Sequence, residues 1–179
     1  NRKEKNMNQP IKNSIERRSC TNYKKEQIKD EELNEILLAG EYAPTGMGLQ
    51  SPKMIVLQNK ETIERLSKLN AKIMGRDIDP FYGAPTVIVV LADKTKMTYV
   101  EDGSLVIGNL MNAAHSLKIG SCWINRAREE FETEEGKKLL KEWNIPDNYV
   151  GIGHCILGYR DGELPQAKPR KEDYVTIIK

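Results

Sequence analysis

The segment Glu101–Leu117 reads EDGSLVIGNLMNAAHSL, and its pattern predicts a helix that becomes apolar on nearly every side. Such a helix must be buried over most of its surface, either in the middle of the fold or at a subunit interface. Its small residues Gly108, Ala113 and Ala114 would allow another helix to approach closely. The other elements are therefore expected to be arranged around this helix.

Strands are predicted on both sides of it. Thr86–Ala92, TVIVVLA, is apolar and β-branched throughout, which is typical of a central strand buried on both faces. Further strands are predicted at Met54–Leu57, Gly120–Ile124 and Tyr149–Gly158, with a last strand-like run at Tyr174–Ile178.

Helices are predicted between the strands. One begins at the capping residue Asp30 and ends at Gly40, where a left-handed residue can close it. Others are predicted at Ile11–Arg18, Glu61–Met74 and Thr133–Trp143. The second of these should carry solvated i,i+4 pairs, namely Glu61 with Arg65 and Glu64 with Lys68. Because strands and helices are interspersed, the predicted class is mixed α and β, with three layers.

The composition narrows the classes of protein. The 179 residues suggest one domain, Ile11–Lys179, after a flexible segment Asn1–Pro10. Hydrophobic residues make up 39% and aromatic residues 6% of the chain, so a partner chain or a cofactor is expected to complete the core. A net charge of +2 argues against nucleic-acid binding, and no apolar run is long enough to cross a membrane. The three cysteines are odd in number and widely spaced, which argues against a disulfide framework and favours the cytoplasm. With only two histidines, a histidine-based metal site is not expected.

Two basic motifs could bind an anion. Arg17-Arg18-Ser19, at the end of a predicted helix, offers two guanidinium groups and a hydroxyl that suit a phosphate dianion. In Lys168-Pro169-Arg170 the proline keeps the chain extended, so the two cations can converge on one ligand. Either motif taken alone is more typical of a solvated basic surface.

Two other segments could lie beside a flat ligand. The loop Ala43–Gln50 has glycines that permit close backbone approach, and Gln50 could match the edge of a pyrimidine-type ring. The strand Gly120–Ile124 contains Cys122, which is interpreted as a packed structural cysteine because no activating residue stands near it in the sequence. The sequence has neither a GxGxxG nor a Walker A motif, so a Rossmann or P-loop site is not predicted.

Together, the order and spacing of these motifs resemble the FMN-dependent nitroreductase family, especially its short members of roughly 170 residues. The resemblance spans about Ile11–Lys179. It implies an α+β, three-layer fold with a central mixed β-sheet flanked by helices, and an intertwined homodimer with two FMN sites at its interface. Thr21 and Gly48 depart from the family pattern, since a basic residue and an asparagine are common there.

The resemblance also implies the residues of the FMN site. Arg17, Arg18 and Ser19 would hold the phosphate and ribityl end, with help from Lys168 and Arg170. The backbone from Cys122 through Trp123 to Ile124 would run alongside the ring. The residues that would approach the ring from the other subunit or from its pyrimidine side are Pro44, Thr45, Gly46, Gln50 and Asn70.

The activity implied is that of an NAD(P)H oxidoreductase working by a ping-pong mechanism, with a nitroaromatic or a quinone as the electron acceptor. The chemistry would come from the flavin, so no catalytic side chain is assigned. Two alternatives keep the flavin: a flavin reductase or dehalogenase-like enzyme of the same fold, and a non-catalytic protein that stores or senses FMN.

Overall fold

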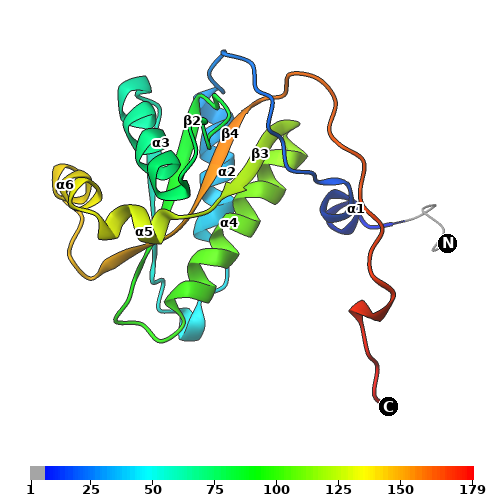
Figure 1. Ribbon diagram of the computed structural model, residues 1–179. Coiled ribbons are helices and arrows are strands. Elements are labelled where there is room, and N and C mark those ends of the chain that lie inside the picture. The colour runs from blue at the N-terminus through cyan, green and yellow to red at the C-terminus, as the bar shows by residue number, and fades with distance from the viewer. Residues whose placement is uncertain (1–6) are drawn as a thin grey trace.

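The computed structural model describes residues 7–179 and is shown in Figure 1. The part of the predicted N-terminal segment before residue 7 lies outside the described residues. In chain order the regular elements are α1 (Gln9–Glu16), α2 (Asp30–Glu41), η2 (Gly46–Gly48), β1 (Pro52–Leu57), α3 (Lys60–Met74), β2 (Thr86–Asp93), α4 (Tyr99–Ser116), β3 (Ile119–Ile124), α5 (Ala127–Glu132), α6 (Glu134–Glu142), β4 (Tyr149–Tyr159) and η3 (Glu172–Tyr174).

The four strands form one sheet in the order β1-β2-β4-β3. All three strand pairs are antiparallel, so within the described chain the predicted mixed sheet is wrong. Within residues 7–179 the one parallel pairing is an isolated bridge between Ser19 and Ser121. β2 lies in the middle with seven buried residues out of eight, which confirms the prediction of a central strand buried on both faces.

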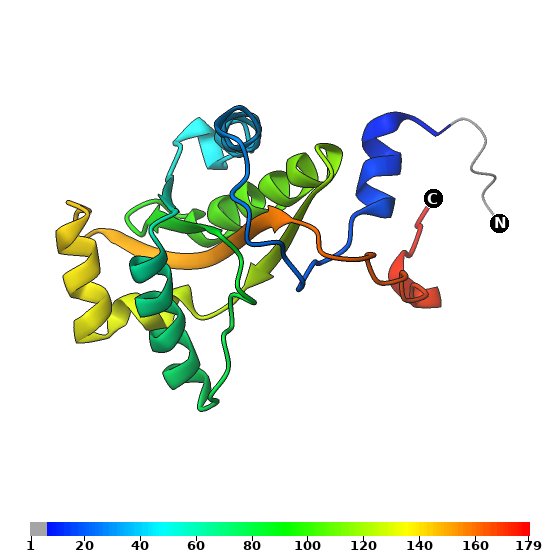
Figure 2. The same ribbon diagram turned by 90° about the horizontal axis from the view of Figure 1, so that it is seen from above.

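Three layers result from the alternation of side chains along β2. Ile88 and Val90 face a core that is shared with α2 and α4, whereas Val87, Val89 and Leu91 face a second core under α3, α5 and α6. Figure 2 shows the two groups of helices on opposite faces of the sheet. The α+β class and the three layers predicted from the sequence are therefore confirmed.

The helix α4 packs on the sheet through only part of its surface. Val106, Ile107 and Leu110 are buried in the core, as its apolar sequence predicts. Val100 and Leu105 are 41% and 48% exposed, so a second apolar face of the same helix is uncovered within residues 7–179. Gly108 lies on α4 with no heavy atom within 4 Å of the place where a Cβ would stand.

Gly40 does not end α2, in contrast to the prediction. It lies inside the helix, which continues to Glu41, and a Cβ there would stand 2.8 Å from Leu110 and 2.9 Å from Met54. The glycine therefore lets α2 approach α4 and β1 closely. The predicted cap is also shifted by one residue, since Lys29 precedes the first turn and its N–H donates to the carboxylate of Glu32.

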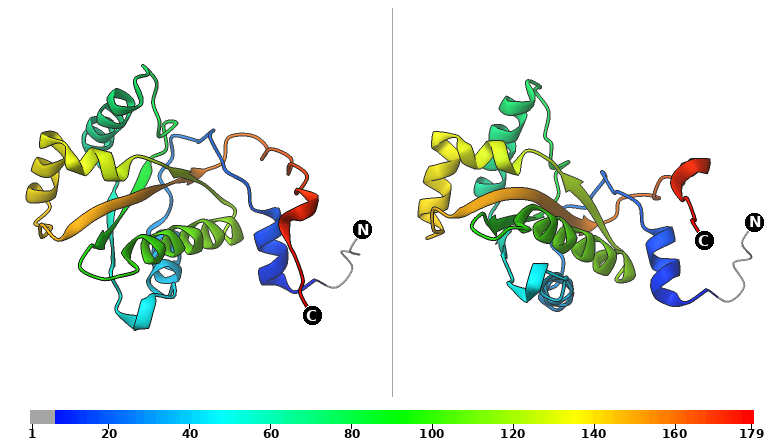
Figure 3. Two further views of the ribbon diagram at one scale, coloured as in Figure 1. Left: turned by 60° about the horizontal axis from the view of Figure 1, so that its bottom comes forward. Right: turned by 90° about the horizontal axis from the view of Figure 1, so that it is seen from below.

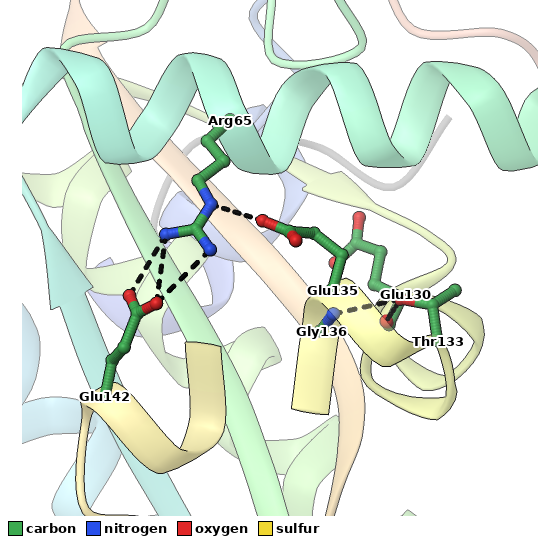
Figure 4. A network of polar contacts seen from close by, with 6 residues as sticks. All are labelled: Arg65, Glu130, Thr133, Glu135, Gly136 and Glu142. Atoms are coloured by element: carbon green, nitrogen blue, oxygen red, sulfur yellow. Dashed lines mark hydrogen bonds and ion pairs between the residues drawn. The ribbon is translucent and has the colours of Figure 1, made fainter. Parts of the chain in front are cut away.

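The segment after β3 contains a helix that the sequence did not predict. The single predicted helix Thr133–Trp143 is preceded by α5, and Thr133 separates α5 from α6. The predicted pair between Arg65 and Glu61 is replaced by a longer-range one. Arg65 on α3 forms ion pairs with Glu135 and Glu142 of α6, as Figure 4 shows. These ion pairs connect α6 to α3.

Both ends of the described chain, α1 and the tail that follows β4, lie on the same side of the molecule (Figure 3). The predicted strand at Tyr174–Ile178 is wrong, because this stretch holds only the end of the short turn η3 and no strand. Its apolar side chains are exposed by 67% at Tyr174, 73% at Val175, 75% at Ile177 and 93% at Ile178. Among residues 7–179 there is no helix with both the length and the apolar character to cross a membrane.

Candidate functional site

The Arg17-Arg18-Ser19 motif lies where the chain leaves α1 and meets the edge strand β3. Ser19 pairs with Ser121, and the N–H of Cys20 donates to the carbonyl of Ser121 at 2.9 Å. These contacts cover only the first half of the outer edge of β3. The second half, Cys122–Ile124, pairs with β4 on one side, and no other strand of the described chain covers its outer side.

The two arginines hold nitrogen atoms that are buried without a partner. Arg17 Nη1 and Arg18 Nε have no hydrogen-bond acceptor among residues 7–179, although Arg18 Nη1 donates to the carbonyls of Ile15 and Arg17. A buried donor left without an acceptor costs roughly 1–3 kcal/mol, more when it is charged. An anion with several oxygens would remove that cost, and phosphate suits guanidinium geometry.

A third arginine, which the sequence did not single out, lies close to this motif. Arg160 Nη2 donates to His115 Nδ1 at 2.9 Å, and Arg160 Nε is buried without a partner in the described part of the chain. Burial and, next, the charge of Arg160 lower the pKa of His115, with smaller contributions in the same direction from Arg17 and Arg18. His115 is therefore neutral at pH 7, and the positive charge here belongs to the arginines.

Arg160 and His115 line a groove of about 830 Å³ between α1 and the second half of α4. Asn13 of α1 and Asn112 of α4 also line it. No local motif marks Arg160, because its side chain joins the cluster only when β4 brings it beside the end of α4.

The open half of β3 presents its backbone rather than its side chains. The ring of Trp123 packs on Gly153, where a Cβ would stand 3.0 Å from the indole, and Ile124 is buried. Cys122 is half-buried, and its burial raises the pKa of its thiol in spite of a hydrogen bond with Ser19. The thiol therefore stays protonated at pH 7, in agreement with its interpretation as a structural cysteine.

Asn70 marks the far end of this open edge. It is fully buried on α3, and its Nδ2 donates to the carbonyl of Asn125 at 2.9 Å and to the carboxylate of Glu130. Its Oδ1 is buried and has no donor among residues 7–179. From Ser121, which pairs with Ser19, to Asn125, which accepts from Asn70, four residues of extended chain cover about 13 Å.

The Ala43–Gln50 loop is held by Asp102, a residue that the sequence did not single out. Asp102 Oδ1 accepts from the N–H of Gly46 at 2.9 Å, and Oδ2 accepts from Ser51 Oγ at 2.7 Å. Burial raises the pKa of Asp102, but the hydrogen bonds from Ser51, Gly46 and Thr98 together outweigh it, so the pKa lies below its ordinary value. A Cβ at Gly46 would stand 2.1 Å from Thr98 Oγ1, so any larger residue would force Thr98 to move.

The structure places the predicted site residues in separate groups. Asp102, which holds the loop, and His115, which lies by the arginines, are thirteen residues apart on α4, or about 20 Å along the helix. No contact within residues 7–179 joins the loop residues to the arginine group. Lys168 and Arg170 lie exposed in the irregular tail that follows β4.

Comparison with known proteins places this arrangement among enzymes. The family model described as the nitroreductase family matches residues 15–80 and 76–159. A protein of Archaeoglobus fulgidus, whose assigned name includes NADH dehydrogenase/NAD(P)H nitroreductase, is 32% identical over 163 residues, which cover 88% of each chain. The protein named FMN reductase [NAD(P)H] of Bacillus subtilis is 24% identical and is matched over 92% of this chain and 70% of its own.

Solved structures show the same fold. A nitroreductase from Bacteroides fragilis with bound FMN superposes with a TM-score of 0.90 and 29% identity, over 97% of this chain and all of the other. A nitroreductase from Desulfitobacterium hafniense with bound FMN has a TM-score of 0.86 and 28% identity over the same shares. The chain therefore belongs to the nitroreductase family.

Proposed function

We propose that this chain is an FMN-dependent NAD(P)H oxidoreductase of the nitroreductase type that works as a homodimer. Family membership and the FMN bound in similar solved structures support it. The observation that carries it is the pair of buried, unpartnered arginine nitrogens of Arg17 and Arg18 at one end of an open strand edge, with the unpartnered Oδ1 of Asn70 at the other. A long ligand with a phosphate at one end and an imide ring at the other fits both.

The residues present therefore fit FMN. Arg17 and Arg18 would bind the phosphate, with Ser19 beside them, and Asn70 would orient the ring along the backbone of Cys122–Ile124. The tail cations Lys168 and Arg170 would join the phosphate if the exposed tail packs over it. When bound, the flavin supplies the transfer of reducing equivalents, and the chain supplies binding, orientation and the exclusion of water.

The second group of predicted ligands, Pro44, Thr45, Gly46 and Gln50, would come from the other subunit. The two groups lie at opposite ends of α4, about 20 Å apart along the helix. If two copies of α4 pack antiparallel, the start of each helix lies beside the end of its twin. The loop held by Asp102 in one subunit then approaches the arginine group of the other, and two complete sites form.

Uncovered apolar surface supports this dimer. Gly108 stands near the middle of α4, beside the exposed Leu105, and has open space around it. A two-fold axis near Gly108 would let the helices approach closely and would cover that face. The exposed apolar side chains of Tyr174–Ile178 would be covered by wrapping the tail around the second subunit.

NAD(P)H and the acceptor would use the site in turn, as in a ping-pong mechanism, with a nitroaromatic or a quinone as acceptor. The test is anaerobic mixing of the FMN-loaded protein with NADH and with NADPH, followed by each acceptor. We expect the flavin absorbance to bleach with at least one nucleotide and to return with the acceptor. A loaded protein that neither nucleotide bleaches would instead be a storage or sensing protein, and a protein that takes up no FMN would contradict both functions.

A flavin reductase is the second candidate, because the Bacillus subtilis relative is named FMN reductase [NAD(P)H]. Free FMN and riboflavin therefore belong in the acceptor panel. Reoxidation that is faster with free flavin than with every nitroaromatic or quinone would favour this candidate over the first.

Arg17→Ala is expected to weaken FMN binding by about 1.5–3 kcal/mol, the usual contribution of a charged hydrogen bond. The measurement is titration of the apo-protein with FMN, followed by the quenching of flavin fluorescence. Arg128→Ala is the matched control, since Arg128 lies on α5 in an exposed pair with Glu132 and should leave the affinity unchanged. An unchanged affinity in Arg17→Ala would refute the phosphate assignment.

Cys122→Ser is expected to leave turnover within about a factor of two, because the thiol is protonated and is not needed as a nucleophile. Steady-state oxidation of NAD(P)H with a quinone acceptor measures this. Complete loss of turnover, with FMN still bound, would make Cys122 a participant in the chemistry.

A further inference from the structure

Three polar side chains without any exposed surface meet where β3 turns into α5. They are Asn70 on α3, Glu130 on α5 and His154 on β4. The ring of Phe81 lies 5.2 Å from that of His154, so the environment is apolar as well as dry. Polar groups in such a place are costly unless each finds its partner, which makes the pattern of donors and acceptors strict.

The protons of His154 and Glu130 follow from the geometry. His154 Nδ1 lies 2.9 Å from the carbonyl of Ile124, which can only accept, so Nδ1 carries a hydrogen. His154 Nε2 lies 2.6 Å from Glu130 Oε2, so one further proton lies between these two atoms. Whichever atom holds that proton, the pair has no net charge and Glu130 Oε1 remains an acceptor.

This acceptor fixes the orientation of the Asn70 amide. Glu130 Oε1 and the carbonyl of Asn125 each accept one N–H of Asn70 Nδ2. The flipped amide would place Oδ1 against two acceptors and leave both N–H groups unpaired. The Oδ1 atom must therefore face the other way, where it is buried without a donor in the described chain.

The corner that carries Glu130 is itself rigid. Thr133 Oγ1 donates to the carbonyl of Glu130 at 2.6 Å and accepts from the N–H of Gly136 at 3.0 Å (Figure 4). A Cβ at Gly136 would stand 1.9 Å from that same carbonyl, so the glycine is required for α6 to start this close to α5. The position of the carboxylate is thus set by both helices.

We propose that Glu130 and His154 are positioning residues for the flavin ring, which act by holding Asn70 with its Oδ1 toward the imide N–H of the ligand. The inference rests on the proposed function, because it needs a ligand that carries an imide donor. Neither Glu130 nor His154 touches the ligand. Asn70 alone makes the contact, and the buried pair determines which end of the amide is presented.

The test is a double-mutant cycle on FMN affinity, measured by titrating the apo-proteins. Glu130→Leu removes the acceptor that fixes the Asn70 amide, so we expect about a tenfold weaker Kd, and about the same for Asn70→Ala. Glu130→Gln should keep the wild-type Kd, because its Oε1 can accept from Asn70 while its Nε2–H donates to His154 Nε2. If Glu130 acts through Asn70, the double variant binds no more weakly than Asn70→Ala. Ser67→Ala is the control, since it removes a hydrogen bond to Asp79 on the same helix and should leave the Kd unchanged.

The outcomes separate the two proposals. Failure of the wild-type protein to bind FMN would refute the proposed function. A wild-type protein that binds, with Glu130→Leu binding equally well or with its effect adding in full to that of Asn70→Ala, would overturn the positioning role alone. Nitrogen-15 NMR of His154 in the wild-type apo-protein is a second test, which does not depend on the folding of a variant. We expect a hydrogen on Nδ1, and an Nδ1 without hydrogen would also overturn the positioning role.

Discussion

Replacing Asp102 with alanine is expected to lower the free energy of unfolding by about 3 kcal/mol and to release the Ala43–Ser51 loop. Asp102 is 2% exposed, and its two oxygens hold the N–H of Gly46 and the hydroxyl of Ser51. Without the carboxylate, both donors lose their acceptor in a place that water reaches poorly. For a chain of this size we expect the midpoint of thermal unfolding to fall by about 6–12 °C, measured by circular dichroism.

Glu101→Ala is the matched control, because Glu101 lies in the same first turn of α4 but is exposed. It loses the favourable interaction of an acidic group with the helix start, typically 0.3–1 kcal/mol, and no buried hydrogen bond. If Asp102→Ala and Glu101→Ala unfold at the same temperature, Asp102 does not hold the loop.

The contribution of Asp102 should also depend on pH in a defined direction. Its pKa in the folded protein lies below the ordinary value of about 3.9, so the unfolded chain takes up a proton first as the pH falls. The stabilisation is fully present above the unfolded pKa and is lost as the pH falls through the folded pKa. The gap in unfolding temperature between wild type and Asp102→Asn should therefore be constant from pH 5 to 7 and narrow below about pH 4.

The elements that carry a strong local pattern could be predicted from the sequence. β2 is apolar throughout and α4 nearly so, and α3 alternates an apolar face with charged residues, so each has the type and nearly the bounds that were expected. Periodicity reports which faces are buried, and burial is what fixes these three elements. The antiparallel direction of the strands could not be predicted from the sequence. It depends on which strands lie next to each other, and the residues of one strand do not determine its neighbours.

Contacts between residues far apart in the chain explain why the roles of Gly40 and Arg65 were predicted wrongly. Gly40 has the residue type of a helix end, but its role is set by Leu110, seventy residues later. Arg65 has an acidic neighbour four residues before it, yet two glutamates of α6 outcompete that neighbour for its guanidinium. For Arg65 the local i,i+4 preference is worth a few tenths of a kcal/mol, and the contacts with α6 override it.

In the candidate site, too, a local motif could be predicted, whereas residues placed by long-range contacts could not. Arg17-Arg18-Ser19 is a contiguous motif that could be noticed without a structure. Asp102, Arg160 and Glu130 are single charged residues that no motif marks, and each becomes part of the site only through a contact with a residue far away in the chain. A search for acidic residues inside apolar helices would have found Asp102, since a carboxylate in such a helix must be paired.

Gly108→Leu is expected to convert the proposed dimer to a monomer and to abolish tight FMN binding. Within one chain a Cβ at Gly108 has no heavy atom within 4 Å, and a leucine favours a helix over glycine by roughly 0.8 kcal/mol. If α4 packs against its twin around this glycine, the added side chain occupies the place of the second helix. Sedimentation velocity measures the assembly, and titration with FMN measures the site.

Gly108→Leu should stabilise the helix α4 within one chain but prevent two chains from associating. A monomeric protein would gain helix stability and keep its affinity for FMN, whereas the proposed dimer loses both partner and cofactor, since the loop held by Asp102 and the arginine group then remain on separate molecules. Lys138→Leu on α6 is the control for adding an exposed leucine to a helix elsewhere. A Gly108→Leu protein that still sediments as a dimer with FMN bound would show that the interface lies elsewhere. Another contact would then have to bring together the loop held by Asp102 and the arginine group, which lie about 20 Å apart along α4.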